Sequence, residues 1–171
     1  EAIKALLQPP FFTVLALPTL IGMVAREWST LEHQIYPLAN TLLRTTDTEV
    51  GQIVMLSLNA VAKKDVLMAL VKVSPLPEEK KAKFAALMAE YDRLRVRRND
   101  IVHGTWDRID EAGNPVLRTA RARGELKRSE ASLALAEILE ITGDIQRLNA
   151  QLWKFNEQDL AELSSGGEVM F

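Results

Sequence analysis

The 171-residue chain contains no cysteine, so disulfide bonds and thiolate metal sites are excluded. It has only two histidines, His33 and His103, which excludes a histidine-rich metal site as well. We therefore expect neither a metal nor a cofactor. The absence of cysteine is compatible with a reducing compartment, and we expect a cytoplasmic location.

A long uninterrupted apolar run is also missing. The segment 9–25 is largely apolar, but it is short and is interrupted by Pro18 and Gly22. It is too short for a membrane span, and it lacks the basic region and cleavage site of a signal peptide. We expect no membrane association, and we interpret this segment as buried or facing a partner.

The remaining composition is that of a globular protein. Hydrophobic residues make up 47% of the chain and charged residues 26%, which is enough apolar material for a core. We expect one domain over residues 1–163 and a flexible tail over 164–171, where Ser-Ser-Gly-Gly occurs. The net charge of −2 does not mark the whole chain as a nucleic-acid binder.

Apolar spacing of three and four residues predicts helices over most of residues 19–104. The first helix is expected over about 19–44, with a kink at Pro37, because proline cannot donate a backbone hydrogen bond. Two shorter, buried helices are expected within 49–73. A further helix should begin at Pro77 and end near Val102.

The C-terminal third combines turn signals with one more helix. Gly104 is a suitable stop for the preceding helix, and residues 105–123 read as a β-hairpin around a Gly-Asn-Pro turn. Ser129 is a suitable N-cap for a last helix over 129–163. The expected fold class is mostly α, an up-and-down helical bundle with a short β-hairpin inserted before the last long helix.

The helix before Gly104 carries the most informative residues. Its apolar stripe consists of Phe84, Leu87, Met88, Tyr91 and Leu94, and Arg98 falls close to the middle of that stripe. A polar edge beside it is formed by Asp92, Arg95, Asn99 and His103. Arg98 and His103 are five residues apart, but the long arginine side chain could still reach the histidine.

A buried guanidinium is costly unless something compensates its charge. Arg98 therefore needs a carboxylate such as Glu27 or Glu32, a wet cleft, or an anionic ligand. A purely structural reading pairs Arg98 with Glu32 in a helical dimer. His103 has a structural reading too, because a histidine near a helix C-terminus interacts favourably with the helix dipole. His33 is interpreted as structural or facing solvent.

The run Arg98-Asn99-Asp100-Ile101-Val102-His103, followed by Gly104, resembles the R-x(4–6)-H signature of HEPN domains. Arg26-Glu27-Trp28 resembles the opening helix of several bacterial HEPN-like proteins, so the resemblance covers about 19–163. It implies a homodimer whose two motifs face each other across a shared cleft, and RNA cleavage without metal, as in toxin–antitoxin or anti-phage defence proteins. The hairpin is an insertion relative to the simplest members, and either Glu32 or Asp92 would supply the upstream carboxylate.

These residue types suit cleavage by the 2′-hydroxyl of RNA itself. His103 would take or supply the proton, and Arg98 would stabilise the charge on the transition state. Asn99 would orient the phosphate or the histidine. Glu32, Asp92 and Arg95 are expected to support the site, and the second copy of a dimer would provide a second histidine.

Basic residues are concentrated around this motif. Residues 93–128 hold ten basic residues against five acidic ones, as a phosphate-binding surface requires. We expect RNA to contact Arg97, Arg118, Arg121 and Arg123. The alternative is a solvated hairpin face that pairs with acids of a dimer partner. Trp106 would either stack on a base or belong to the hairpin core.

Two main functions therefore remain open from the sequence. The first is a metal-independent endoribonuclease acting as a toxin or in defence, with an antitoxin or another protein as partner. The second is a non-catalytic HEPN-like module for dimerisation or for binding nucleotide, RNA or protein.

Overall fold

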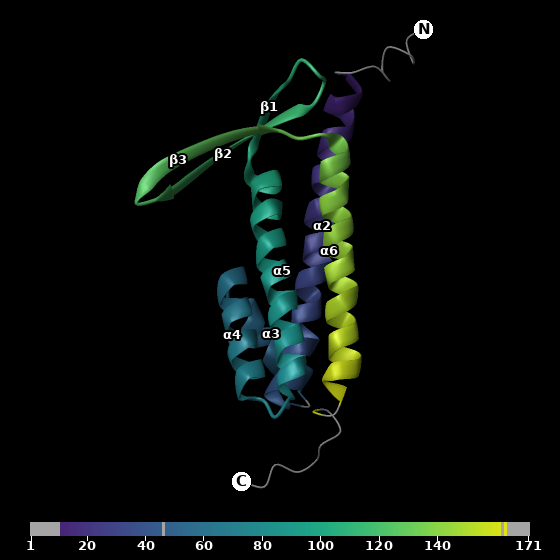
Figure 1. The fold of residues 1–171 in the computed structure, drawn as a ribbon, viewed down its shortest axis with the longest axis vertical. Coiled ribbons are helices and arrows are strands. Elements are labelled where there is room, and N and C mark those ends of the chain that lie inside the picture. The colour runs from purple at the N-terminus through teal and green to yellow at the C-terminus, as the bar shows by residue number, and fades with distance from the viewer. Residues whose placement is uncertain (1–10, 46, 162, 164–171) are drawn as a thin grey trace. The chain divides into compact units, whose positions relative to one another are not determined.

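The computed structural model describes residues 11–45, 47–161 and 163. In this part of the chain five α-helices and a short π-helix accompany one three-stranded antiparallel sheet (Figure 1). The mostly helical fold class is confirmed at that level. The expected flexible tail and the start of the segment 9–25 lie outside the described residues.

The chain divides into two compact units. One unit comprises residues 1–28 and 96–145, and the other comprises residues 29–95 and 146–171, each within the described residues. The first unit contains the whole sheet and the end of the helix that carries Arg98 and His103. The second contains both short helices. The candidate site can therefore be described within the first unit alone.

Helix α2 (Phe11–Leu43) begins well before the expected position 19. Pro18 and Pro37 both lie inside it, and the helix continues through each, since a proline removes only one backbone donor while its neighbours keep their own. Thr13 and Val24 are buried, whereas the Val14 side of the first turns is exposed. The apolar segment is thus helical and only partly buried.

Helices α3 (Thr48–Leu56) and α4 (Ala60–Val73) are the two short helices that the sequence predicted. Side-chain oxygens of Asp47 and Asn59 accept backbone N–H bonds at their first turns. The expected burial is wrong for most of α3. Its buried side chain is Met55, and its exposed large apolar residues are Val50, Ile53, Val54 and Leu56. A helix of nine residues is buried here along one side only, so its other apolar side chains remain exposed.

Helix α5 (Glu78–His103) starts one residue after Pro77 and ends at His103. Its predicted apolar stripe is buried, with Phe84, Leu87, Met88, Tyr91 and Leu94 all at 9% exposure or less. Gly104 follows at once. A Cβ at Gly104 would lie 2.2 Å from Cδ1 of Leu117 and 2.4 Å from the carbonyl oxygen of Asp100. Glycine is therefore required where the chain leaves the helix and meets the sheet.

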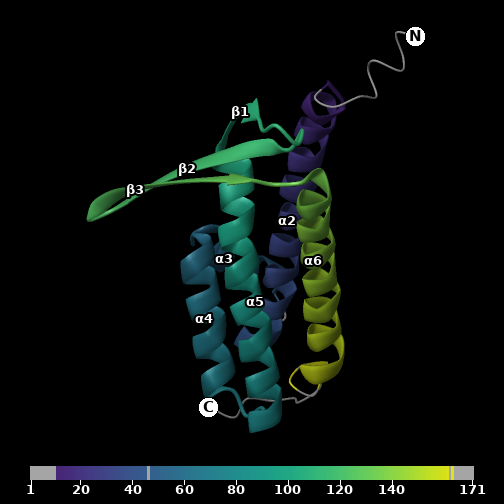
Figure 2. The same ribbon diagram turned by 45° about the horizontal axis from the view of Figure 1, so that its top comes forward.

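The sheet consists of β1 (Thr105–Ile109), β2 (Pro115–Arg123) and β3 (Glu125–Ser132), in the order β1-β2-β3. Gly124 joins β2 to β3 with φ of 79°, a conformation that glycine adopts without steric cost. The ladder of β1 with β2 stops at the pair Thr105–Arg118. Beyond this pair, β2 and β3 continue as a two-stranded ribbon (Figures 1 and 2).

The predicted two-stranded hairpin and the helix over 129–163 are corrected by this third strand. Ser129 does not cap a helix; it lies in β3 opposite Thr119, and the two hydroxyl oxygens are 2.7 Å apart. The tight turn at Gly124 gives every residue of β3 a cross-strand partner, which outweighs the capping tendency of one serine. Helix α6 (Leu135–Lys154) starts later, and Glu137 accepts the Ala134 backbone N–H at 2.7 Å.

A π-helix (Phe155–Asp159) follows α6. The predicted apolar stripe of the last helix is confirmed as buried over Ile138, Ile141, Ile145, Leu148, Leu152 and Phe155. The spacing of three and four residues identified the buried face correctly even though the start of the helix was misplaced.

Candidate functional site

The last turns of α5 bring three motif residues together. Nη1 of Arg98 donates a hydrogen bond to Oδ1 of Asn99 at 3.0 Å. The same Nη1 lies 3.3 Å from Nε2 of His103. A spacing of five residues does not place two side chains on one helix face, so the reach of the arginine makes this contact.

A guanidinium only donates hydrogen bonds, so a hydrogen bond between these two atoms requires Nε2 of His103 as the acceptor. That arrangement corresponds to the tautomer with its proton on Nδ1. A neutral imidazole of this kind has the lone pair that a general base needs.

Arg98 has no carboxylate partner in the part of the chain that the structure describes. Its Nε is buried without a hydrogen-bond partner, and its Nη1 contacts the Asn99 amide and the His103 ring. The two carboxylates considered for it are occupied, since Glu27 pairs with Arg26 and Glu32 with Lys63 at 3.5 Å. The positive charge of Arg98 thus remains available to an anionic ligand.

Asp92 and Arg95, which were expected to support the motif, form a separate cluster in the second unit. Arg95 lies 2.8 Å from Asp92, and Lys64 lies 3.8 Å from the same carboxylate. The hydrogen bond from Arg95 holds the pKa of Asp92 below its ordinary value. The structure groups these residues with Lys64.

His103 lines a polar pocket of about 540 Å³. The sheet supplies all other residues of its lining: the hydroxyl residues Thr105, Thr119 and Ser129, the charged residues Arg118, Arg128 and Glu130, and Ala120. This volume is within the range of small-molecule sites, roughly 300–1,000 Å³. Two arginines and three hydroxyls around an imidazole are a suitable lining for a phosphodiester.

The expected RNA-binding arginines are partly neutralised by acids of the same chain. Arg121 binds both carboxylate oxygens of Asp100 at 2.6 Å. Arg118 pairs with Asp107, and its Nε lies 3.8 Å from Glu130. Arg97 is exposed, and the side chain of Arg123 lies outside the described residues.

Several residues of the pocket were not predicted from the sequence, because a helix was expected from residue 129 where the structure has the end of β3. Arg128, Ser129 and Glu130 reach the pocket only because β3 pairs with β2. The sequence did contain a sign of the second hairpin. Gly124 separates two runs of about eight residues, and neither run has large apolar residues at the spacing of three and four that is typical of a helix. Read as a turn, Gly124 would have predicted the second hairpin.

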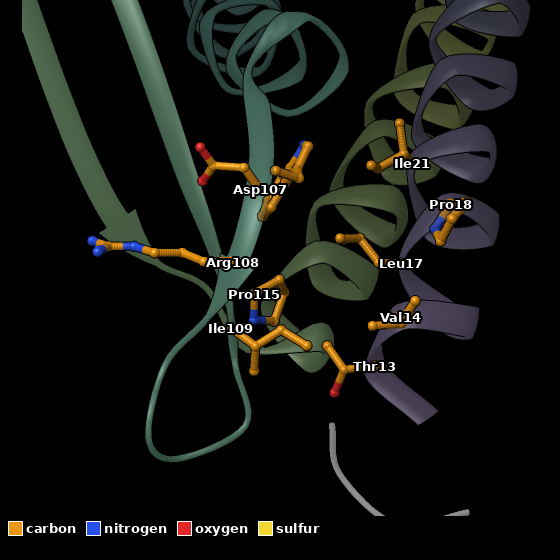
Figure 3. Close-up of a pocket in the computed structure, with 10 residues that line it drawn as sticks. Thr13, Val14, Leu17, Pro18, Ile21, Asp107, Arg108, Ile109 and Pro115 are labelled. Atoms are coloured by element: carbon orange, nitrogen blue, oxygen red, sulfur yellow. The ribbon is translucent and has the colours of Figure 1, made fainter. Parts of the chain in front are cut away.

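A second pocket of about 720 Å³ lies between the start of α2 and the first two strands. Figure 3 shows its lining, with Val14, Leu17 and Ile21 on α2 facing Ile109 and Pro115. Trp106 also lines it, and its indole N–H donates to the carbonyl of Ile101 at 2.9 Å. Trp106 is half-buried in the sheet region.

Within the described residues, no three His, Cys, Asp or Glu side chains converge in a group that could hold a metal ion. No described helix is long and apolar enough to cross a membrane. Comparison with known proteins finds no matching family model, no similar curated protein and no similar solved structure.

Proposed function

We propose that this chain is a metal-independent endoribonuclease of the HEPN type, acting in the cytoplasm as a homodimer. The observation that carries the proposal is the arrangement of Arg98, which holds Asn99 and His103 without a neutralising carboxylate. His103 also lines a pocket rich in arginine and hydroxyl groups. The proposal includes a role as a toxin or in defence, with an antitoxin as partner. This role is supported by the sequence resemblance to HEPN domains.

The reaction needs no group beyond the side chains of the two copies in a dimer and the RNA. The neutral His103 takes the proton of a 2′-hydroxyl, and the resulting 2′-oxygen attacks the adjacent phosphorus. The bond from phosphorus to the 5′-oxygen breaks, which leaves a 2′,3′-cyclic phosphate and a 5′-hydroxyl end. Arg98 stabilises the additional negative charge on the phosphoryl oxygens, and Asn99 keeps the guanidinium in position.

The leaving 5′-oxygen needs a proton, and one histidine cannot act as base and acid in the same step. A second copy of the chain would supply the other imidazole if the two His103 pockets faced each other. Arg118 and Arg128 line the pocket from the sheet, so the phosphates on either side of the cleaved bond would lie along β2 and β3.

The test is cleavage of end-labelled single-stranded RNA in the presence of EDTA. The parent protein should produce 2′,3′-cyclic phosphate ends, and His103→Ala and Arg98→Ala should each reduce the rate by at least about 100-fold. His33→Ala is the matched control for the histidine, because His33 is exposed and packs edge-to-face on Tyr36. Arg147→Ala is the control for the arginine, because Arg147 is exposed on α6.

Equal cleavage by all five proteins would indicate a contaminating nuclease and would remove the proposal. If no RNA is cut but RNA or nucleotide binding depends on Arg98 and His103, the chain is the non-catalytic binding module instead. Folding of each variant is checked by circular dichroism before any rate is compared.

A further inference from the structure

The outer strand of the sheet is uncovered along its whole length. All eight residues of β3 are exposed, and β3 is the last strand in the order β1-β2-β3. Beyond the pair Thr105–Arg118, the ribbon of β2 and β3 has no third strand in the described chain (Figure 2). A free edge of this kind carries a row of unpaired backbone N–H and C=O groups.

A two-stranded ribbon in water is marginally stable at best. The ion pair of Arg121 with Asp100 holds the ribbon against the end of α5, but it leaves the outer edge of β3 open. Adding a strand from another chain would satisfy the free backbone groups and turn the ribbon into part of a larger sheet. The identity of that strand can be argued from the sequence of β3.

We infer that β3 pairs with β3 of a second copy of this chain, antiparallel and centred on Ser129. A two-fold axis perpendicular to the sheet places one residue opposite itself and keeps both faces aligned, so residues equally far from the centre face each other. With Ser129 at the axis, Arg128 of each copy lies opposite Glu130 of the other. The pairing then contains two symmetric pairs of opposite charge.

The neighbouring registers are unfavourable. Centring on Lys127, Arg128 or Glu130 places two like charges directly opposite each other, which is destabilising. Centring on Leu126 or Ala131 leaves much of the eight-residue strand without a partner. Ser129 is the position that combines a nearly full ladder with complementary charges.

This pairing also brings the candidate sites together. Arg128, Ser129 and Glu130 are the three residues at the axis, and all three line the pocket that contains His103. The second copy would therefore contribute residues beside each pocket, and the two His103 pockets would adjoin. The inference rests on the homodimer of the proposed function and names the surface through which its copies meet.

The first test is the dimer dissociation constant, measured by analytical ultracentrifugation without RNA. Arg128→Glu and Glu130→Lys should each raise that constant by at least about tenfold, because each variant replaces two attractive pairs by two repulsive ones. An equimolar mixture of the two variants should dimerise like the parent, since both attractive pairs return in the mixed dimer. Lys127→Glu and Glu125→Lys carry the same changes in charge and should leave the constant unchanged.

The second test uses the absence of cysteine in the chain. Ser129→Cys should form a disulfide-linked dimer on mild oxidation, because residues opposite each other at the axis have Cα atoms about 4.5–5.5 Å apart. Lys127→Cys, which would lie opposite Ala131 of the other copy, should remain uncrosslinked. This measurement does not depend on whether a charge reversal disturbs the ion pairs that Glu130 makes with Arg108 and Arg118 of its own chain.

A parent that stays monomeric, or a dimer that neither charge reversal weakens, would overturn the inference. Loss of the dimer in both variants without recovery in the mixture, or equal crosslinking at positions 127 and 129, would overturn it too. None of these results depends on RNA cleavage. A dimer formed through β3 that does not cut RNA would remove the proposed ribonuclease and leave the pairing intact.

Discussion

Nη1 of Arg98 lies 3.3 Å from Nε2 of His103, at the end of the same helix. Because arginine only donates, a hydrogen bond between these two atoms requires the imidazole proton on Nδ1. We therefore expect the arginine to favour this tautomer of the residue proposed as the general base. Three of the predictions below concern the end of α5 and the groups around it, and the other concerns the turn between β1 and β2.

Nitrogen chemical shifts should show His103 as the Nδ1–H tautomer at a pH where the ring is neutral. With only two histidines in the chain, a His33→Gln variant assigns the signals without ambiguity. In Arg98→Ala the preference should disappear, because Nε2 loses its donor. His33 should be unchanged by that substitution. A proton on Nε2 of His103 in the parent would contradict the observed contact.

Gly104→Ala should destabilise the protein by about 1–3 kcal/mol, the usual cost of overpacking. The new Cβ would meet the Asp100 carbonyl oxygen at 2.4 Å, and a backbone atom cannot move aside as a leucine methyl can. Gly22→Ala is the matched control, because nothing lies within 4 Å of a Cβ there. That change within a helix should instead stabilise by about 0.5–1 kcal/mol. Urea unfolding measures both, and equal effects would refute the argument.

Asp110→Asn should lower stability at pH 7 and have a smaller effect at pH 3. The Asn114 backbone N–H bonds Oδ1 of Asp110 at 2.8 Å, and with a hydrogen bond from Ser132 it holds the pKa of Asp110 below its ordinary value of 3.8. A carboxyl with a depressed pKa stabilises the fold above its unfolded-state pKa, and this contribution disappears as the pH falls through the folded-state pKa. Urea midpoints at the two pH values test this.

Asp65→Asn is the control for that measurement. Asp65 is exposed on α4, and it has no hydrogen bond or ion pair within the described residues. Its midpoints should match those of the parent at both pH values. A difference between Asp110→Asn and the parent that persists unchanged at pH 3 would mean that the hydrogen bonds act independently of the charge.

Asp100→Asn should strengthen RNA binding, because it releases Arg121 from a bidentate ion pair. The logarithm of the binding constant should fall more steeply with the logarithm of salt concentration, by up to about one unit for one additional phosphate contact. Binding is measured in a His103→Ala background so that the RNA stays intact. Adding Arg121→Ala should remove the gain. An unchanged salt dependence would show that Arg121 does not contact phosphate.

Local patterns in the sequence were sufficient to determine most helices and their buried faces. Spacing of three and four residues identified the stripe from Phe84 to Leu94 and the stripe from Ile138 to Phe155, since helix periodicity depends only on nearby residues. The same reasoning placed Arg98, Asn99 and His103 at the end of one helix. The end of α5 was predicted to within one residue, because Gly104 is a local stop signal.

Tertiary structure decided which partners these side chains have. Whether Arg98 would meet a carboxylate depended on Glu27 and Glu32, and each of these is held by a different cation. The lining of the His103 pocket depended on β3, whose strand conformation comes from pairing with β2 across Gly124. Cross-strand pairs join residues that are distant along the chain, so a sequence pattern read within one segment cannot reveal them. The residues that carry the proposed chemistry are set by the sequence, and the surroundings in which they would act are set by the fold.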